Sequence, residues 1–248
     1  MTKAESKVID FIKKHILLFL LVAVTIIAIF LRICGMDFQS DDFNSFLNSW
    51  WSIIKLNDFT GLATQVGNYN IPYQIIIYLM TLLPLNALYA YKIVSIIFDF
   101  VLAISTAMLV YSFAKNNRRL KAILTYSAVL LSATVIFNSS VWAQCDSIYT
   151  SFIILAILFL HKDKPIASFV FIGIAFAFKL QTVFIIPVLL YYWISTKKIS
   201  ILHFFIIPAL DVIMCLPAII MGRPFIDIIT IYAEQTDYGK LIQMNCPN

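Results

Sequence analysis

The apolar run Ile16–Leu31 reads ILLFLLVAVTIIAIFL, contains no charged residue and follows four lysines between residues 3 and 14. In lipid such a run forms a helix, because a helix satisfies its own backbone hydrogen bonds. Basic residues before an apolar run are also typical of a secretory signal, but no small-x-small cleavage site follows this one. We therefore expect an uncleaved signal anchor whose N-terminus is cytoplasmic.

The whole chain of 248 residues shares the character of this run. Hydrophobic residues make up 61% of it and charged residues 12%, and the mean hydropathy is +0.90. A soluble domain has about 25% charged residues, so the composition predicts an all-α integral membrane protein. The formal net charge of +5 requires no nucleic-acid partner, because the basic residues are sorted to one side of the membrane.

Basic clusters predict how the chain crosses the membrane. Positive charge favours the cytoplasmic side, and clusters occur at residues 3–14, 115–121, 161–164 and 196–198. If all of them are cytoplasmic, an even number of crossings separates each pair. Residues 1–248 then form a single transmembrane domain with about seven transmembrane helices, which we expect at Ile16–Leu31, Tyr91–Phe113, Ala122–Phe137, Ser147–Leu160, Ile166–Phe178, Val183–Ile194 and Ile201–Met221.

One further apolar segment, Ile71–Leu83, is too short to be counted among these crossings. At ~1.5 Å per residue it reaches only about 20 Å, against a hydrocarbon core of ~30 Å. Pro72 and Pro84 stand at its two ends. We therefore expect a juxtamembrane or re-entrant helix on the outer side of the membrane.

The first outer loop, residues 34–70, carries unusually polar sequence for a connection between apolar spans, and reads DFQSDDFNSFLNSWW from Asp37 to Trp51. After Asp41 and Asp42 the apolar residues recur at helical spacing, so we expect juxtamembrane helices in the membrane interface. The two aspartates stand at the start of this helix, where a carboxylate is stabilised by the helix N-terminus. They are either helix caps or catalytic carboxylates.

Two other outer segments carry polar side chains. Asn138–Thr150 reads NSSVWAQCDSIYT and places Gln144 and Asp146 at the mouth of two helices. Lys179 stands at the tip of the predicted hairpin between residues 166 and 194. A lysine in apolar sequence is costly unless it is paired or hydrated, so we expect an anionic partner, either Asp146 or a phosphate.

Other chemistry has weaker support in the sequence. Asp99 and Asp211 fall within predicted spans, where we expect hydrogen-bonded structural roles. No residues have metal-ligand spacing; converging carboxylates are compatible with a divalent cation, but no cofactor is required. No nucleotide-binding fingerprint occurs either. A group-transfer reaction outside the cytoplasm would thus need a donor already carried there, most simply a lipid-linked one.

The chain resembles polytopic glycosyltransferases of the GT-C superfamily, most closely bacterial relatives of the second mannosyltransferase of GPI-anchor synthesis. The matching stretches cover nearly the whole chain, and their joint order is more specific than any single one. They are DFQSDDFNSFLNSWW, GNYNIPY (Gly67–Tyr73), IFDF (Ile97–Phe100), VWAQCDSIY (Val141–Tyr149), FAFKLQ (Phe176–Gln181) and QTDYGKLIQMNCPN (Gln235–Asn248).

The resemblance implies a GT-C-like helical bundle in the cell membrane that moves a sugar from a polyprenyl-phosphate donor to a glycan or lipid acceptor on the outer face. It also implies a catalytic base in the first outer loop, which by position is Asp42, with Asp41 as the alternative. Lys179, helped by Gln181, would then neutralise the donor phosphate, and Asp146 would orient Lys179 or the acceptor. The remaining residues expected to bind substrate are Gln144, Tyr69 and Tyr73, the two tyrosines by stacking on sugar rings.

Two alternatives to this function are a membrane transporter or lipid flippase without covalent chemistry, and an inactive fragment. Transporters place polar groups near the middle of the bilayer, which only Asp99 and Asp211 would do here. The family pattern continues with further spans after the motif that ends at Asn248. We therefore expect this chain to be the N-terminal part of a longer enzyme.

Overall fold

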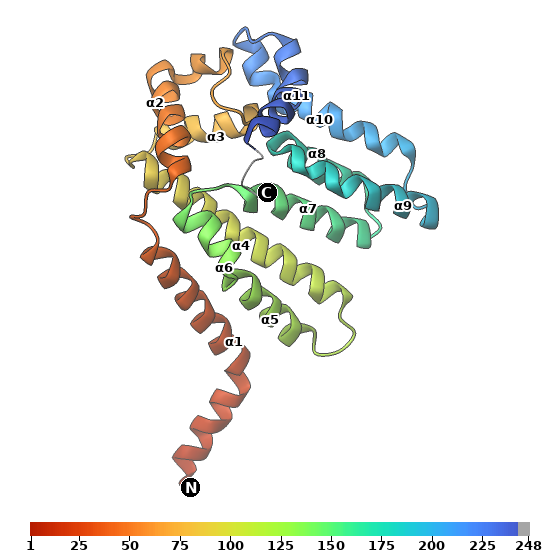
Figure 1. The fold of residues 1–248 in the computed structure, drawn as a ribbon. Helices are drawn as coiled ribbons and strands as arrows, with labels where there is room; N and C mark the ends of the chain where they lie inside the picture. The colour runs from red at the N-terminus through yellow and green to blue at the C-terminus, as the bar shows by residue number, and fades with distance from the viewer. Residues whose placement is uncertain (243–248) are drawn as a thin grey trace.

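The computed structural model describes the backbone of residues 1–242 and the side chains of residues 1–233, and every regular element in these residues is helical, as predicted. The side chains of residues 235–248, the last of the stretches that resemble the GT-C pattern, lie outside this described part. The α-helices (Figure 1) are α1 (Lys3–Cys34), α2 (Asn48–Asn57), α3 (Ile71–Thr81), α4 (Ala87–Phe113), α5 (Arg118–Leu130), α6 (Ala133–Ile136), α7 (Asp146–His161), α8 (Pro165–Phe178), α9 (Ile186–Thr196), α10 (Ile206–Ile220) and α11 (Phe225–Ile242). The 3-10 helices are η2 (Asp58–Ala63), η4 (Leu180–Ile185) and η5 (Ile201–Phe205), and the π-helices are η1 (Phe43–Leu47) and η3 (Phe137–Val141).

Three helices in the described part are long and apolar enough to cross a membrane: α1, α4 and the continuous segment Ile201–Ile220. The pair α5 and Ala133–Val141 is a fourth candidate if its 51° bend belongs to one crossing. Helices α7, α8 and Leu180–Thr196 are apolar but shorter. The 16 residues of α7 reach about 24 Å. Length therefore supports three or four spans, where the apolar runs predict about seven.

The bundle is built around α4. Helix α4 packs against α5 and α7, α7 packs against α8, and α8 packs against α10. Helix α1 lies against α5 and leaves the bundle toward its N-terminus (Figure 1). The pairs α4–α5 and α7–α8 are consecutive α-helices joined by short connections, whereas the pairs α4–α7, α8–α10 and α1–α5 bring together helices that other elements separate in the chain.

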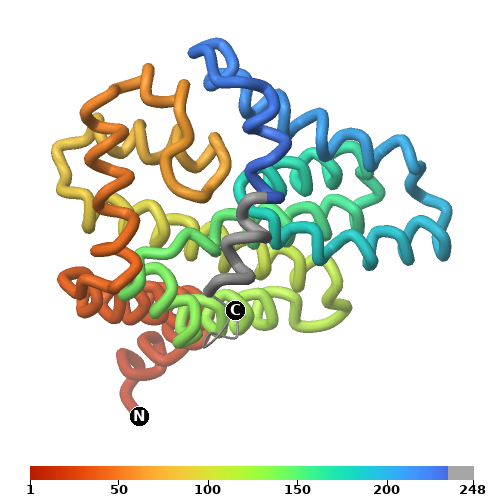
Figure 2. The backbone as a smooth tube through the Cα atoms, turned by 45° about the horizontal axis from the view of Figure 1, so that its top comes forward, coloured from red at the N-terminus to blue at the C-terminus, as the bar shows by residue number. Residues whose placement is uncertain are grey.

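The first outer loop folds into the small unit formed by η1, α2, η2 and α3, beside the N-terminal end of α4 (Figure 2). Phe43, Leu47, Trp51 and Ile54 are all buried in its core. The Trp51 ring lies 6.0 Å from the Tyr91 ring of α4, centroid to centroid. The predicted helical spacing is therefore confirmed, but protein rather than lipid headgroups covers this apolar stripe.

Ser40 caps the start of this helix. Its Oγ accepts a hydrogen bond from the backbone N–H of Phe43 at 3.2 Å, which satisfies one of the unpaired donors of a helix N-terminus. Asp42 makes no capping hydrogen bond. The capping interpretation therefore does not describe Asp42, and its carboxylate is free for another contact.

Helix α3 has 11 residues, close to the short helix predicted from the two prolines. Asn70 caps it by accepting from the backbone N–H of Ile71 at 2.8 Å, and Pro72 occupies its first turn, where a missing N–H costs nothing. The same Asn70 donates from Nδ2 to Asp211 Oδ1 at 3.0 Å. The predicted hydrogen-bonded role of Asp211 is confirmed.

A buried ion pair joins α1 to α4. Arg32 Nε donates to Asp99 Oδ2 at 2.9 Å, and the two side chains are 1% and 0% exposed. The hydroxyls of Ser139 and Ser147 donate to the same carboxylate at 2.5 and 2.6 Å, and Arg32 Nη1 donates to the carbonyl of Leu130 at 3.0 Å. One charge pair therefore connects α1, α4, α5, η3 and α7, and the predicted structural role of Asp99 is confirmed.

Lys92, buried within α4, fixes the end of α1. Its Nζ donates to the carbonyls of Gly35, Met36 and Phe38 at 2.8, 3.0 and 2.6 Å. These carbonyls belong to the turn that follows Cys34, the last residue of α1, and a charged donor binds carbonyls strongly. The chain therefore leaves α1 in a fixed direction and enters the first outer loop.

The turns that carry basic clusters lie together at the C-terminal end of α4, away from Lys92 (Figure 1). The rings of Phe113 and His161 are 3.9 Å apart, which places the turn after α4 beside the turn after α7. Lys198 forms an ion pair with Asp163 at 2.8 Å, which adds the turn after α9. Three of the four predicted clusters thus share one end of the bundle.

We expect Asp99→Asn to destabilise the bundle by about 3–5 kcal/mol, because it leaves the buried Arg32 charge without its counter-ion. Denaturant-induced unfolding in detergent, followed by circular dichroism, measures the difference. Asp163→Asn removes the exposed partner of Lys198 at a position where φ is 54°, which asparagine tolerates. Equal unfolding free energies for the two variants would contradict the role assigned to the Arg32–Asp99 pair.

Candidate functional site

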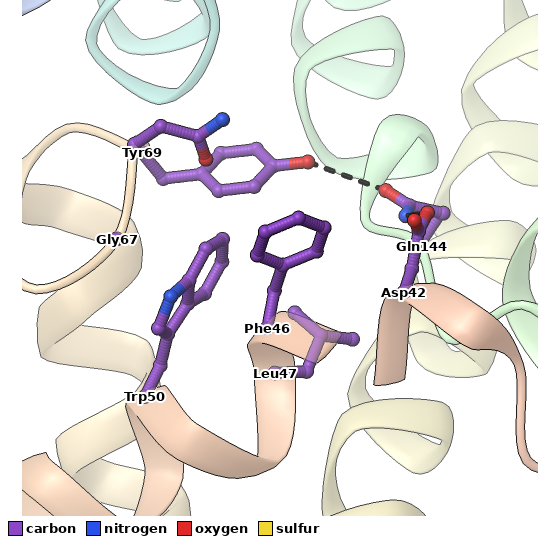
Figure 3. A pocket seen from close by; sticks show the side chains of 8 residues that line it. Asp42, Phe46, Leu47, Trp50, Gly67, Tyr69 and Gln144 are labelled. Atoms are coloured by element: carbon purple, nitrogen blue, oxygen red, sulfur yellow. Dashed lines mark hydrogen bonds between the residues drawn. The ribbon is translucent and has the colours of Figure 1, made fainter. Parts of the chain in front are cut away.

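A cavity of about 380 Å³ opens between the first outer loop and the connection before α7. Aromatic rings form one wall, and a carboxylate and an amide form the other (Figure 3). Its size lies within the ~300–1,000 Å³ that is usual for small-molecule sites. The lining residues are Asp42, Phe46, Leu47, Trp50, Gly67, Asn68, Tyr69 and Gln144.

Helical spacing places three of these side chains on one stripe. Asp42, Phe46 and Trp50 follow each other at intervals of four residues, so they share a face of the helix. This face adjoins the buried stripe that contains Phe43 and Leu47. The helix therefore turns one stripe toward the protein core and the neighbouring stripe toward the cavity.

A hydrogen-bond chain crosses the cavity. Gln144 Nε2 donates to Asp42 Oδ2 at 2.5 Å, and the Tyr69 hydroxyl donates to Gln144 Oε1 at 3.2 Å. Burial raises the pKa of Tyr69 well above its usual value, so this hydroxyl stays neutral and remains a donor. Gln144 thus holds the Asp42 carboxylate toward the cavity.

An ion pair between Lys179 and Asp146 lies against the ring of Tyr69. Asn138 Nδ2 donates to Asp146 Oδ2 at 2.8 Å, and the Lys179 and Asp146 side chains are 17% and 36% exposed. The Lys179 ammonium lies 5.6 Å from the ring centroids of both Tyr69 and Tyr149, within cation–π range. This arrangement is the predicted pairing of Lys179 with Asp146.

The helix ends determine where this pair stands. Asp146 is the first residue of α7, where the helix dipole favours a carboxylate. Lys179 has extended backbone (φ −154°, ψ 132°) between the end of α8 and the start of η4. A residue in this conformation cannot continue the helix. The lysine therefore projects from the break between two apolar helices.

Tyr69 is the residue that joins the cavity to the ion pair. It bonds Gln144 through its hydroxyl, and its ring contacts the ammonium of Lys179. Trp50 meets the ring edge-on at 5.7 Å, and Tyr73 lies 4.8 Å away, centroid to centroid. The Asp42 carboxylate and the Lys179–Asp146 ion pair are thus separated by one aromatic side chain.

Five of the eight predicted site residues are linked by the contacts above: Asp42, Gln144, Tyr69, Asp146 and Lys179. Figure 3 shows the first three of them. The other three take different positions. Asp41 is exposed and does not line the cavity. Gln181 is exposed on η4. Tyr73 is 2% exposed, so its ring supports Tyr69 and is closed to a ligand in this structure.

Phe46, Trp50 and Asn138 also belong to the site, although they are not among the residues predicted from the sequence. The spacing of Asp42, Phe46 and Trp50 was a usable signal, since it is the i, i+4, i+8 repeat of one helix face. Asn138 gave no local signal, because its partner Asp146 follows after a break in the helix. Within the described residues, no group of three or more His, Cys, Asp or Glu side chains is placed to hold a metal ion.

Comparison of the chain with protein-family models, with curated proteins and with solved structures found no match.

We expect Gly67→Ala to disrupt the aromatic wall. Gly67 has φ +73°, and a Cβ there would lie 2.4 Å from Cε2 of Trp50. Positive φ alone costs an alanine roughly 1–2 kcal/mol, and displacement of the indole ring adds to this cost. The thermal midpoint of the purified protein should therefore fall.

Gly222→Ala is the matched control, because Gly222 has φ +97° and no atom within 4 Å of an added Cβ. It has the backbone strain without the clash, so its thermal midpoint should fall less. A loss at Gly222 equal to that at Gly67 would show that Trp50 does not need the glycine.

Proposed function

We propose that this chain acts as a GT-C-type membrane glycosyltransferase, similar to mannosyltransferases, in cell-surface glycan synthesis. It would move a sugar from a polyprenyl-phosphate donor to a glycan or lipid acceptor on the outer face of the cell membrane. The observation that carries the proposal is the site around Tyr69. A carboxylate in an aromatic-lined cavity and a lysine suited to a phosphate lie on its two sides.

The proposed topology is multi-pass, with about seven crossings and a cytoplasmic N-terminus. It is supported by the grouping of basic turns at one end of α4, since positive charge favours the cytoplasm. The Asp42 cavity and the Lys179–Asp146 pair lie toward the other end. Helices α7, α8 and η4–α9 would cross by bilayer thinning and with cover from neighbouring helices.

In the proposed reaction Asp42 is the general base. The acceptor hydroxyl oxygen attacks the anomeric carbon and forms the new glycosidic bond. The bond from that carbon to the phosphate oxygen breaks, and the polyprenyl phosphate leaves with the electron pair. The hydroxyl proton passes to the Asp42 carboxylate, and attack from the face opposite the phosphate inverts the anomeric centre. Gln144 positions the carboxylate by the hydrogen bond that it donates.

Lys179 would stabilise the charge that develops on the leaving phosphate. It is partly buried, and Asp146 holds it at the break between α8 and η4. Asn138 fixes Asp146 in turn. The rings of Phe46, Trp50 and Tyr69 line the cavity and offer the sugar an apolar surface.

The transporter alternative has no specific support. A transporter would need polar side chains within the helices that are available to bind a substrate. The two acids there, Asp99 and Asp211, already accept hydrogen bonds from the protein. Asp99 accepts from Arg32 and two serines, and Asp211 accepts from Asn70.

The base assignment is tested with membranes that contain the chain, supplied with polyprenyl-phosphate [³H]mannose. Transfer of label to membrane acceptors should fall by about 10²–10⁴-fold in Asp42→Asn, the usual contribution of a general base. The thermal midpoint should stay near that of the wild type, because asparagine keeps the size of the side chain.

Asp41→Asn is the neighbouring comparison. Since Asp41 is exposed and outside the cavity, we expect transfer at close to the wild-type rate. Loss of sugar transfer in Asp41→Asn, together with normal transfer in Asp42→Asn, would identify Asp41 as the general base. Wild-type membranes that transfer no more label than membranes lacking the chain would contradict the glycosyltransferase proposal itself.

The topology is tested by single cysteines in a chain whose four native cysteines are replaced. Cysteines at the exposed positions Asp41 and Gln181 should react in intact cells with a membrane-impermeant maleimide. Cysteines at the exposed positions Arg119 and Lys164 should react only after the membrane is permeabilised. Labelling of Gln181→Cys only after permeabilisation would exclude the hairpin crossing of residues 166–194.

A further inference from the structure

A second cavity, of about 660 Å³, lies between α1, α4 and α5, toward the end of the bundle that carries the basic turns. It adjoins the small core around Ala103 and Leu130. None of its lining residues belongs to the site around Tyr69. They are Leu21, Thr25, Ile104, Ala107, Met108, Tyr111, Ser112, Arg118, Ala122, Ile123, Tyr126 and Lys162.

The wall of this groove is mostly apolar, and its few interior polar groups are already engaged. The Thr25 hydroxyl shares a hydrogen bond of 3.0 Å with the Tyr126 hydroxyl, and Thr25 also donates to a backbone carbonyl. Ile104 and Met108 are about half exposed, at 51% and 45%. The groove therefore opens sideways along α4, where the surface of a spanning helix faces lipid.

Two cations and no acid stand among the lining residues of the groove. Arg118 donates from Nε to the carbonyl of Ala114 at 2.6 Å, and its guanidinium lies 5.9 Å from the Tyr111 ring. Lys162 lies 5.9 Å from the ring of Phe159. Both side chains are exposed. Arg118 is the first residue of α5 and Lys162 follows the last residue of α7, and the turns at these two positions are adjacent in space.

We propose that this groove binds one anionic phospholipid, with an acyl chain along α4 and the phosphate held by Arg118 and Lys162. An apolar wall favours hydrocarbon and disfavours a free phosphate, while paired cations beside a groove between membrane helices suit an anionic headgroup. The inference rests on insertion of the chain in a membrane and is independent of the proposed transferase activity. The lipid would belong to the leaflet that we propose to be cytoplasmic.

The test uses the full chain, purified in a neutral detergent and titrated with dioleoylphosphatidylglycerol or dioleoylphosphatidylcholine. Native mass spectrometry counts the lipids retained. The wild-type chain should retain one phosphatidylglycerol in preference to phosphatidylcholine. The double variant Arg118→Gln/Lys162→Gln should weaken phosphatidylglycerol binding by about 30-fold, because each basic residue contributes roughly fivefold at an anionic lipid.

The matched control is Arg119→Gln/Lys164→Gln, which removes the same charge from the same two turns but leaves the groove intact. We expect it to change binding by less than about twofold, because screening weakens exposed charges away from the headgroup. Equal losses in the two double variants would show general surface attraction and overturn the site. Equal retention of phosphatidylcholine, or displacement of the lipid by inorganic phosphate, would overturn it as well.

Ala107→Phe tests the apolar part of the groove without any change of charge. The phenyl ring would occupy the space between α1 and α4, so phosphatidylglycerol should be lost although both cations remain. Unchanged retention in a folded Ala107→Phe variant would place the lipid elsewhere. If this variant does not fold, the two charge variants decide the question.

Discussion

The buried contact between Arg32 and Asp99 is the interaction on which the rest of the structure depends. Removing two charges from water is costly, and the pair is tolerable because its hydrogen bonds reach three further helical segments, α5, η3 and α7. Ser139 and Ser147 stand on either side of the segment that carries Gln144 and Asp146. By binding both serines, Asp99 anchors the two ends of that segment. A charge pair within the bundle thereby determines the geometry of a site that it does not touch.

Lys92 makes a second connection of this kind, because it ties the end of α1 to α4 by three carbonyls. The loop that supplies Asp42 starts from those carbonyls. Both parts of the site, the first outer loop and the connection before α7, are thus attached to α4 by buried charged side chains. The helices themselves are mostly apolar and could slide past one another, so these polar contacts supply the register that hydrophobic packing alone leaves loose.

Local pattern in the sequence predicted the helical class and the short α3, and it offered Asp146 as one of two partners for Lys179. Apolar runs mark helices, and a lysine in apolar sequence requires a partner or water. The partner of Asp99 was not predictable in this way, since Arg32 is 67 positions away and pairs only in the folded bundle. The burial of Tyr73 and the exposure of Gln181 likewise follow from tertiary packing. Apolar length alone also made seven runs resemble crossings, although packing within the bundle accounts equally for short apolar helices.

The π-helix η1 has a consequence for how this protein and its relatives compare. A π-turn holds about one residue more than an α-turn, and such turns are frequent at functional sites. If the same residues wound as an ordinary α-turn, everything after η1 would rotate by about 100°. Trp51 would then leave the core, and Trp50 would leave the cavity. A homologue with an ordinary α-turn here should therefore show a single-residue gap in alignment, which keeps the positions of Trp50 and Trp51 on the same faces of the helix.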